Sequence, residues 1–358
     1  MRVLALGSDR SQQGILFPDT KAAKRQVAYA KHLGELHIIG LSLVRDGARP
    51  YEQENVHVHP TNSLSRLTYA FDAFRIATKL PKPDIITVQD PFEVGLVALL
   101  LSRRFKVPLH VQVHTDAFAF SYTLFSPLNF VRTHLALYVL KKANGIRVVS
   151  EKIKGDIEVR MDVKCPLAVL PIYVDVERVR TAVHDAGLEV RFAAFGTKVL
   201  VVARLEAEKN VALALHAFKE SAPPDSCLII VGQGREEAKL KVLCGKLGLD
   251  DRVFFEGTKD TTSYYKMADL ILVTSRYEGY GMVIVEALAA GKPVLSTDVG
   301  IAREAGAIVT SEEGFGRSLA HWFSEGPRRG ELSMRSYGSF EEYASEYAAN
   351  IRATLGAI

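Results

Sequence analysis

Short apolar runs alternate with helix-like segments along the whole chain, and this alternation restricts the fold more than any other feature. The runs have the length of strands buried on both faces, and the segments between them have helical periodicity. Such alternation is typical of parallel sheets covered by helices on both faces, the doubly wound α/β class. The expected strands are residues 3–6, 36–43, 84–88, 109–113, 145–150, 168–170, 198–203, 227–231, 252–255, 270–273 and 294–296, and the helices of the first half are 21–33, 64–78, 92–105 and 130–143.

The pattern occurs twice, which predicts two domains. A chain of 358 residues is too long for one ordinary core. The expected junction lies between Val179 and Thr197, where polar, Ala-rich sequence ends before a new apolar run. We therefore expect an N-terminal domain over residues 1–185 and a second domain over residues 186–335. Sheets of this class bind ligands beyond the carboxyl ends of their strands, so a cleft between the two domains is the expected ligand position.

Composition excludes several classes of protein. Nearly half of the residues are apolar and a quarter are charged, without a low-complexity tract, which is typical of a soluble globular protein. No apolar run reaches the roughly 18 residues of a membrane span, and the first residues lack the features of a signal peptide. Cys165, Cys227 and Cys244 have neither zinc nor disulfide spacing and suit reduced thiols. We expect a cytoplasmic protein that does not bind nucleic acid.

Net charge is +4 and unevenly distributed. Residues 1–190 hold 25 Lys and Arg against 19 Asp and Glu, a balance of +6, and the rest of the chain holds 20 against 22. A modestly basic N-terminal half favours an anionic acceptor or an anionic membrane surface. Ordinary solvated side chains explain the same excess equally well.

Residues 276–291, R-Y-E-G-Y-G-M-V-I-V-E-A-L-A-A-G, lie between two expected strands and predict a glycine loop followed by a helix. The glycines let the backbone approach a ligand closely, and the first turn of the helix offers free N–H groups to an anion. Glu286 is the only charged residue from Met282 to Gly291. A buried carboxylate needs a partner, and a ligand hydroxyl would serve. Exposure to solvent, or a pair with a nearby Lys, is the alternative.

The two glutamates in E-G-Y-G-M-V-I-V-E resemble the signature of the retaining GT-B glycosyltransferases, and family GT4 (glycosyl transferases group 1) is the nearest match. This resemblance implies two Rossmann-like doubly wound domains that face a cleft, with a C-terminal helix over residues 336–358 crossing back to the first domain. Ser339 and the aromatic spacing after it fit the start of that helix. The resemblance further implies that Glu278 accepts hydrogen bonds from the donor sugar and that Glu286 binds the ribose. The remaining donor-binding residues of this motif would be Gly279, Tyr280, Gly281, Met282 and Val283.

Two basic residues follow the expected strand that ends near Ala203. Arg204 and Lys209, in R-L-E-A-E-K, resemble the family's pair that binds the pyrophosphate. A departing diphosphate can be neutralised by a metal or by fixed cations and helix N-termini. No convincing D-x-D motif is present, so we expect no metal site and no cofactor. A lone Arg and Lys near a helix start are otherwise more often solvated surface residues.

Further resemblances concern the loops around the cleft. His114, after the expected strand 109–113, would contact the donor sugar near its 6-hydroxyl, and main-chain groups around Lys259 would contact the base. Gly14 is the one glycine of a first loop that carries a Gly–Gly pair in many relatives. Gly232-Gln233-Gly234 lacks the third glycine of a dinucleotide fingerprint and is interpreted as a tight turn. The aromatic stretch 117–125 fits either buried core, which is slightly favoured, or an amphipathic edge that touches lipid.

Together these features predict a retaining, metal-independent hexosyltransferase. The donor would be a nucleoside-diphosphate sugar, with UDP- or GDP-sugars expected, and the acceptor a glycan or a lipid-linked sugar in cell-envelope or polysaccharide synthesis. Peripheral contact with the inner face of the membrane is a further expectation. A sugar-nucleotide epimerase of the same fold and a non-catalytic nucleotide-sugar-binding protein are the alternatives. An epimerase would change the donor without an acceptor, and a binding protein would show no turnover.

Overall fold

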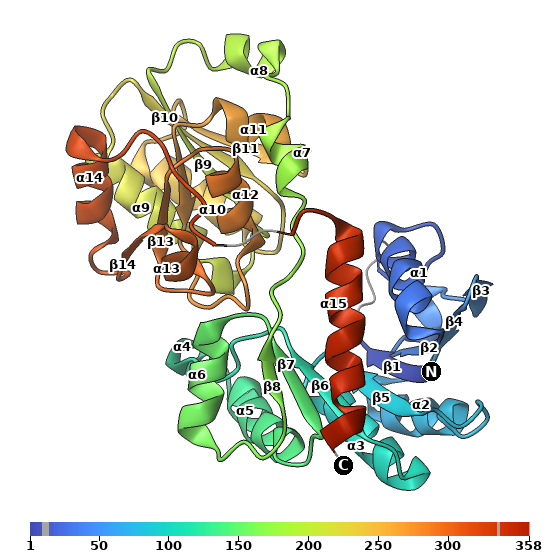
Figure 1. The fold of residues 1–358 in the computed structure, drawn as a ribbon. Coiled ribbons are helices and arrows are strands. Elements are labelled where there is room, and N and C mark those ends of the chain that lie inside the picture. Colours follow the sequence, from blue (N-terminus) through green and yellow to red (C-terminus); the bar gives the residue numbers. More distant parts are fainter. Residues whose placement is uncertain (9–13, 335–336, 358) are drawn as a thin grey trace. The chain divides into compact units, whose positions relative to one another are not determined.

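The computed structural model describes residues 1–8, 14–334 and 337–357 and divides into two compact units (Figure 1). Unit 1 comprises Met1–Pro171 and Gly338–Ile358, and unit 2 comprises Ile172–Tyr337. The expected boundary at 185/186 therefore differs from the observed one. Helix α7 (Val176–Arg180) buries Val176 and Val179, and it packs against α12 (Met282–Ala289) of unit 2. Its two buried valines make this short helix part of the second core, although the surrounding polar sequence had indicated a junction.

Unit 1 is built on an eight-stranded sheet in the order β3-β4-β2-β1-β5-β6-β7-β8. Neighbouring strands are parallel throughout, except for the antiparallel pair β3–β4 at one edge. The strand order reverses at β1 and β5, so the carboxyl ends of these two strands form the switch point at which such sheets bind ligands. The strands are β1 (Arg2–Gly7), β2 (Glu35–Gly40), β3 (Tyr51–Gln53), β4 (Val56–Pro60), β5 (Ile85–Val88), β6 (Leu109–Val113), β7 (Gly145–Val148) and β8 (Leu167–Val169).

Helices connect these strands and cover the sheet. The connecting helices are α1 (Lys21–Leu33), α2 (Tyr69–Ala77), α3 (Glu93–Phe105), α4 (Phe120–Phe125), α5 (Pro127–Leu140) and α6 (Glu151–Arg160), with 3-10 turns η1 (Val44–Asp46) and η2 (Arg66–Thr68). The C-terminal helix α15 (Phe340–Ala353), followed by the 3-10 turn η4 (Leu355–Ala357), also belongs to unit 1 and lies beside α1 (Figure 1). Ser339 caps α15 by accepting a hydrogen bond from the backbone N–H of Glu342. Tyr29 of α1 stacks on Tyr347 of α15 with ring centroids 4.4 Å apart.

Unit 2 contains a six-stranded, wholly parallel sheet in the order β11-β10-β9-β12-β13-β14. Its switch point lies between β9 and β12. The strands are β9 (Thr197–Val202), β10 (Ser226–Val231), β11 (Val253–Gly257), β12 (Leu270–Val273), β13 (Val294–Thr297) and β14 (Ile308–Thr310). Besides α7 and α12, the helices are α8 (Ala186–Arg191), η3 (Ala207–Lys209), α9 (Val211–Ser221), α10 (Glu237–Leu247), α11 (Thr262–Met267), α13 (Ala302–Ala305) and α14 (Phe315–Glu325).

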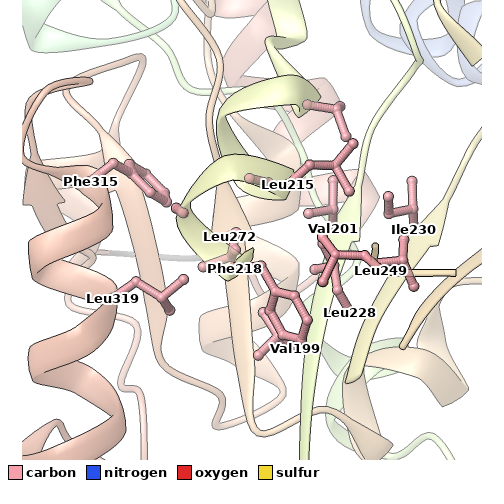
Figure 2. Packing of buried hydrophobic residues seen from close by; sticks show 14 of the residues in the cluster. Val199, Val201, Leu215, Phe218, Leu228, Ile230, Leu249, Leu272, Phe315 and Leu319 are labelled. Atoms are coloured by element: carbon pink, nitrogen blue, oxygen red, sulfur yellow. The ribbon is translucent and has the colours of Figure 1, made fainter. Parts of the chain in front are cut away.

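The core of unit 2 lies between this sheet and the helices α9 and α14. Figure 2 shows Leu215 and Phe218 of α9 between the strand residues and Phe315 and Leu319 of α14. Residues buried on this side include Val199, Val201, Leu228, Ile230, Leu249 and Leu272. Their burial fixes β9 and β12 as rigid central strands, so the loops at the carboxyl ends of these strands are held at defined positions.

The two doubly wound sheets confirm the expected fold class, and most expected elements match within a few residues. Two expectations need correction, and one pair of strands was missed. The expected strand 36–43 ends at Gly40, and the expected helix 64–78 is a 3-10 turn followed by α2. The edge pair β3–β4 was not expected at all, because V-H-V-H-P alternates without a continuous apolar run. None of the described helices has the length and apolar character that a membrane span needs.

The aromatic stretch 117–125 is only partly core. Phe118 and Tyr122 are buried, but Phe120 and Leu124 of α4 are 77% and 64% exposed. The preference for a buried stretch was therefore wrong for the outer side chains of α4. Exposed apolar side chains continue along α5 at Leu128, Phe130, Val131 and Tyr138. A cluster of this kind on two consecutive helices is unusual for a surface that faces only water.

Candidate functional site

Lys209 and Glu278 meet at the switch point of unit 2. Lys209 ends the turn η3 that follows β9, and Glu278 lies in the glycine loop after β12. The ammonium Nζ of Lys209 donates to Oε1 of Glu278 at 2.5 Å, and the Ser275 hydroxyl donates to the same oxygen at 2.8 Å. Only 14% of the Lys209 side chain and 19% of the Glu278 side chain is exposed. The pair is thus held by its surroundings, unlike a flexible surface ion pair, and its burial strengthens the attraction.

Arg204 does not join this pair. Its side chain is 71% exposed, and its Nη2 donates to Oε1 of Glu208, four residues along the chain, at 3.0 Å. Asn210 stands at the N-cap position of α9 with φ of 48°, but its amide donates to Glu312 and does not cap the helix. The structure brings Lys209 to Glu278, whereas Arg204 is an exposed cation that pairs with Glu208.

The helix α12 begins directly after the glycine loop. Its N-cap, Gly281, has φ of 96°, a backbone conformation that glycine adopts without strain, and no side chain caps the helix. The amides at the start of α12 are therefore available to an anionic ligand. Tyr280 anchors the loop in two ways. Its side chain is buried, with 5% exposed, and its backbone carbonyl accepts a hydrogen bond from the backbone N–H of Ile301. Met282 is exposed on the first turn.

Glu286 has a partner that the sequence did not reveal. The Tyr265 hydroxyl, on α11, donates to Oε2 of Glu286 at 2.8 Å, and Tyr265 itself is fully buried. Burial raises the pKa of Glu286, and the hydrogen bond from Tyr265 and the charge of Arg178 oppose that rise. The carboxylate thus pairs with a tyrosine and not with a lysine. Twenty-one residues separate the two partners, and no local pattern in the sequence links them.

Other expected residues of unit 2 lie near the same edge of the sheet. Lys259 is exposed and follows β11, two residues after that strand ends at Gly257. Gly232 has φ of 143°, and a Cβ atom there would overlap the carbonyl oxygen of Ala203. Gly234 meets the carbonyl of Leu205 in the same way. The glycines of G-Q-G are therefore needed because two loops pack closely, as expected for a tight turn.

A cavity of about 400 Å³ adjoins the same edge of the sheet of unit 2. Ser275, which donates to Glu278, lines the cavity together with residues from the ends of β13 and β14. Its polar lining also includes Arg276, Thr297, Asp298, Arg303, Thr310, Ser311 and Glu312. Hydroxyl groups and charges of both signs around one hollow suit a polyhydroxylated ligand.

In unit 1, His114 follows β6, as expected. Its Nε2 lies 3.3 Å from Oε1 of Gln112, and burial, with the nearby charge of Arg147, lowers the pKa of His114 to about 3. The imidazole is therefore neutral at physiological pH and acts as a hydrogen-bonding group. His110, on β6 itself, is buried, and its ring nitrogens contact the Thr87 hydroxyl and the Asn350 amide oxygen.

A cavity of about 430 Å³ lies at the switch point of unit 1 and contains a residue that was not predicted as part of the site. Asp90, after β5, lines it with Ser8, Arg66, Tyr69 and Arg132, among others. The Oδ1 atom of Asp90 is buried and has no hydrogen-bond partner among the described residues. Burial raises the pKa of this carboxyl to about 7. Its position two residues after the end of β5 was a signal that the sequence offered.

Gly14 lies at the end of the first loop, of which residues 9–13 are outside the described chain. Its carbonyl oxygen accepts a hydrogen bond from the hydroxyl of Thr20, the residue that caps α1. The structure therefore gives Gly14 a role in the start of α1. Its expected contact with the donor stays a prediction.

Two family profiles match the chain. "Glycosyltransferase Family 4" matches residues 28–178, and "Glycosyl transferases group 1" matches residues 194–315. The first match lies almost entirely in unit 1 and the second within unit 2, in the order that the fold requires. The chain belongs to the GT-B glycosyltransferases. The resemblance drawn from E-G-Y-G-M-V-I-V-E is thus confirmed at the level of the family.

Relatives and solved structures agree with this assignment. The chain is 25% identical to alpha-monoglucosyldiacylglycerol synthase of Streptococcus pneumoniae over 64% of its length, and the match spans 55% of that relative, little more than half. It is 27% identical to the amylovoran biosynthesis glycosyltransferase AmsD of Erwinia amylovora, over 73% of this chain and 72% of that one. Among solved folds, sucrose-phosphate synthase from Thermosynechococcus elongatus superposes with a TM-score of 0.74 at 17% identity, covering 99% of this chain and 94% of that one. Anabaena HepE, crystallised with UDP-glucose, gives 0.70 at 18% identity over 100% and 98%.

Proposed function

We propose that this glycosyltransferase moves a hexosyl group from a nucleoside-diphosphate sugar to a hydroxyl acceptor with retention of configuration. The observation that carries the proposal is the enclosed Lys209–Glu278 pair beside the uncapped start of α12. One cation, one carboxylate and free amides at a single point suit a ligand with both a diphosphate and sugar hydroxyls. Structures of HepE with UDP and UDP-glucose support a donor of this class.

The ion pair between Lys209 and Glu278 suggests how the site receives its donor. Glu278 neutralises Lys209, so little unbalanced charge is buried. An arriving diphosphate competes for the ammonium, and Glu278 is then available to accept hydrogen bonds from the sugar. Arg204, exposed on the next turn, can rotate toward the second phosphate. Tyr265 orients Glu286, which is proposed to bind the two ribose hydroxyls.

In the proposed transfer, the bond between the anomeric carbon and the diphosphate oxygen breaks as the acceptor oxygen bonds to the same face of that carbon. The proton of the acceptor hydroxyl passes to the departing phosphate oxygen. Lys209, Arg204 and the α12 amides stabilise the charge that develops on the diphosphate. His114, neutral because of its surroundings, contributes a hydrogen bond to the sugar and no proton transfer. The proposal assigns charge neutralisation to these groups and needs neither a metal ion nor a cofactor.

For the acceptor we propose a lipid-linked sugar or a growing glycan at a membrane surface. The exposed apolar side chains of α4 and α5 support contact with lipid, and the cavity around Asp90 in the same unit can receive a polar acceptor group. The names of two relatives, a glucosyldiacylglycerol synthase and an amylovoran enzyme, fit this acceptor class.

The donor proposal is tested first by a thermal-shift panel of UDP-, GDP- and ADP-sugars, since a ligand of the folded state raises Tm. Turnover is then measured with the selected donor. Lys209→Ala and Glu278→Ala should each lower kcat by about 100- to 1,000-fold, the range for a lost electrostatic stabiliser. Lys241→Ala removes a similar ion pair, to Glu237 at 2.7 Å on α10, and serves as the control. Near wild-type turnover in both site variants would contradict the assignment.

Two further results would redirect the proposal. A donor that changes when no acceptor is present would indicate an epimerase, and a strict requirement for Mg²⁺ would exclude the metal-independent mechanism. Membrane contact is tested by sedimentation with anionic vesicles. Phe120→Ser/Leu124→Ser should reduce binding to vesicles while leaving the UDP-sugar thermal shift unchanged. Equal sedimentation of variant and wild type would exclude α4 as the contact.

A further inference from the structure

Three histidines and two glutamates gather on β2, β3 and β4 of unit 1, on the β3 side of the sheet. β2 and β4 are parallel neighbours, and their register places His37 beside His57 and Ile39 beside His59. Because alternate residues of a strand share a face, Glu35 and His37 of β2 lie on the same face as His57 and His59 of β4. The imidazole of His37 stacks on that of His57, with centroids 4.6 Å apart, and on that of His59 at 5.6 Å.

Two imidazoles converge on one carboxylate oxygen. Nε2 of His37 lies 3.0 Å, and Nε2 of His57 lies 3.9 Å, from Oε1 of Glu35. One ligand atom from each of the three residues lies within 4.8 Å of the other two, and among the described residues this is the one His, Cys and acidic group with such spacing. Ligands of a tetrahedral zinc ion lie roughly 3.3 Å apart, since each is about 2.0–2.1 Å from the metal. Shifts of these side chains by about 1–2 Å would bring the three atoms to this spacing around one ion.

The groups behind these three atoms are arranged as metal-ligand supports usually are. Nδ1 of His57 lies 3.2 Å from Oε1 of Glu52 on β3, so a carboxylate can hold its N–H and direct Nε2 inward. Nδ1 of His37 lies 3.3 Å from Nε2 of His59. Arg2 donates to the other carboxylate oxygen of Glu35 at 2.7 Å, which leaves Oε1 for a ligand. With His59 as the acceptor of a hydrogen bond from Nδ1 of His37, Nε2 of His37 keeps its lone pair for a metal ion.

We propose that Glu35, His37 and His57 bind a divalent transition-metal ion, with Zn²⁺ as the best fit to two nitrogens and one oxygen, and with water as the fourth ligand. His37 is mostly buried, whereas 23% of His57 and 36% of Glu35 is exposed, so an ion can enter from solvent. The ion joins β2 to β4 and, through Glu52, orders the antiparallel edge strand β3. This site belongs to unit 1, whereas Lys209 and Glu278 of the proposed donor site belong to unit 2.

A hydrogen-bonded cluster without metal is the competing explanation, and titration of the whole chain with ZnCl₂ distinguishes the two. The experiment uses tag-free, chelator-treated protein with Cys165→Ser, because this half-buried thiol could bind zinc on its own. Calorimetry should give one Zn²⁺ per chain, and Zn²⁺ should raise Tm. Co²⁺ in place of Zn²⁺ should produce the visible absorption bands of a tetrahedral ion.

Variants of the proposed ligands and of a control histidine distinguish a metal site from a hydrogen-bonded cluster. Glu35→Gln/His57→Gln should abolish stoichiometric binding and the Co²⁺ bands, whereas His216→Gln, which removes an exposed histidine of α9, should change neither. Glu52 is 75% exposed, so Glu52→Gln should preserve the fold and weaken zinc binding by roughly 10- to 100-fold. Absence of zinc uptake by the wild type, or equal uptake by the double variant, would overturn the proposal. Circular dichroism verifies that each variant is folded, and the UDP-sugar thermal shift reports on unit 2 separately.

Discussion

Asp90 shows how a single residue can couple the proposed acceptor cavity to the stability of unit 1. Its Oδ1 atom is buried without a partner among the described residues, and the pKa of its carboxyl is raised to about 7 by burial. The charge of Arg132 opposes that rise and Glu93 adds to it. The folded protein therefore holds a proton on Asp90 at a pH where the unfolded chain has released it. The contribution of Asp90 to the free energy of unfolding therefore decreases as pH rises from about 4 to 7.

Asp90→Asn should remove this dependence, because the amide has almost the same shape and never ionises. The variant should gain stability relative to the wild type between pH 5 and pH 8, by up to a few kcal/mol. Urea unfolding monitored at both pH values measures the difference. Asp251→Asn, at an exposed position, provides the control. An identical pH dependence in Asp90→Asn and wild type would show that Asp90 is ionised in the folded protein.

Tyr265 offers a test of the proposed ribose contact. Tyr265→Phe keeps the buried ring and removes the hydroxyl that donates to Glu286. A less well-oriented carboxylate should bind the ribose more weakly, so we expect KM for the donor to rise about tenfold, within the range for hydrogen bonds to charged groups. Because this contact is the same in the ground and transition states, kcat should change little.

Tyr264→Phe is the matched control for Tyr265→Phe. Tyr264 is the preceding residue, it is also buried, and its hydroxyl donates to a different carboxylate, that of Glu256, at 2.8 Å. A rise in KM that is equal in the two variants would assign the effect to the packing of α11. It would then count against Glu286 as the ribose ligand.

At the scale of elements, hydrogen bonds and close packing hold α15 against the rest of unit 1. Arg147 of β7 is fully buried and donates to Gln112, to the Tyr343 hydroxyl of α15 and to the carbonyls of Leu170 and Pro171. Gln112 in turn donates to the Tyr347 hydroxyl of α15 and lies beside His114. At the start of β7, a Cβ atom on Gly145 would overlap the side chain of Thr354. The C-terminal helix thus supports the strand that positions His114.

Gly145→Ala should therefore separate the end of α15 from β7 and destabilise unit 1 by about 1–3 kcal/mol, the usual cost of overpacking. Gly155→Ala is the matched control, because Gly155 lies inside α6 with open space around its Cα. That variant should gain up to about 1 kcal/mol from helix propensity. Denaturant unfolding measures both, and Thr354→Ala should partly rescue Gly145→Ala. Equal stability of the two glycine variants would contradict the close contact.

At the scale of the whole molecule, two units with separate sheets predict two unfolding transitions. Units with separate cores often fail to unfold as one cooperative body. A donor nucleotide at 100 times its Kd should stabilise unit 2 by about 2.7 kcal/mol and shift only one calorimetric transition. Gly145→Ala should lower the other. A single transition that responds to both changes would show that the units unfold together.

The sequence predicted what local periodicity determines. Lys21–Leu33 was expected as a helix with the observed bounds, and the glycine loop before α12 lies where the motif placed it. Contacts between distant segments left no such pattern. Tyr265 with Glu286, Gln112 with Tyr347, and the histidines of β2 and β4 come together only when strands pair and helices pack. The boundary after Pro171 was missed for the same reason. The short helix α7 belongs to unit 2 because it packs against α12, and the local sequence does not show this contact.

Unit 1 is assembled from both ends of the chain, with all of unit 2 inserted between Pro171 and Gly338. On the ribosome, residues 1–171 therefore emerge long before the helix that covers Arg147 and Tyr29 has been translated. Unit 2 is continuous in sequence and can complete its core first, since domains fold as units during synthesis. Residues 1–171 are thus among the last to reach their native packing, and nascent chains that lack α15 would expose a surface that chaperones can recognise.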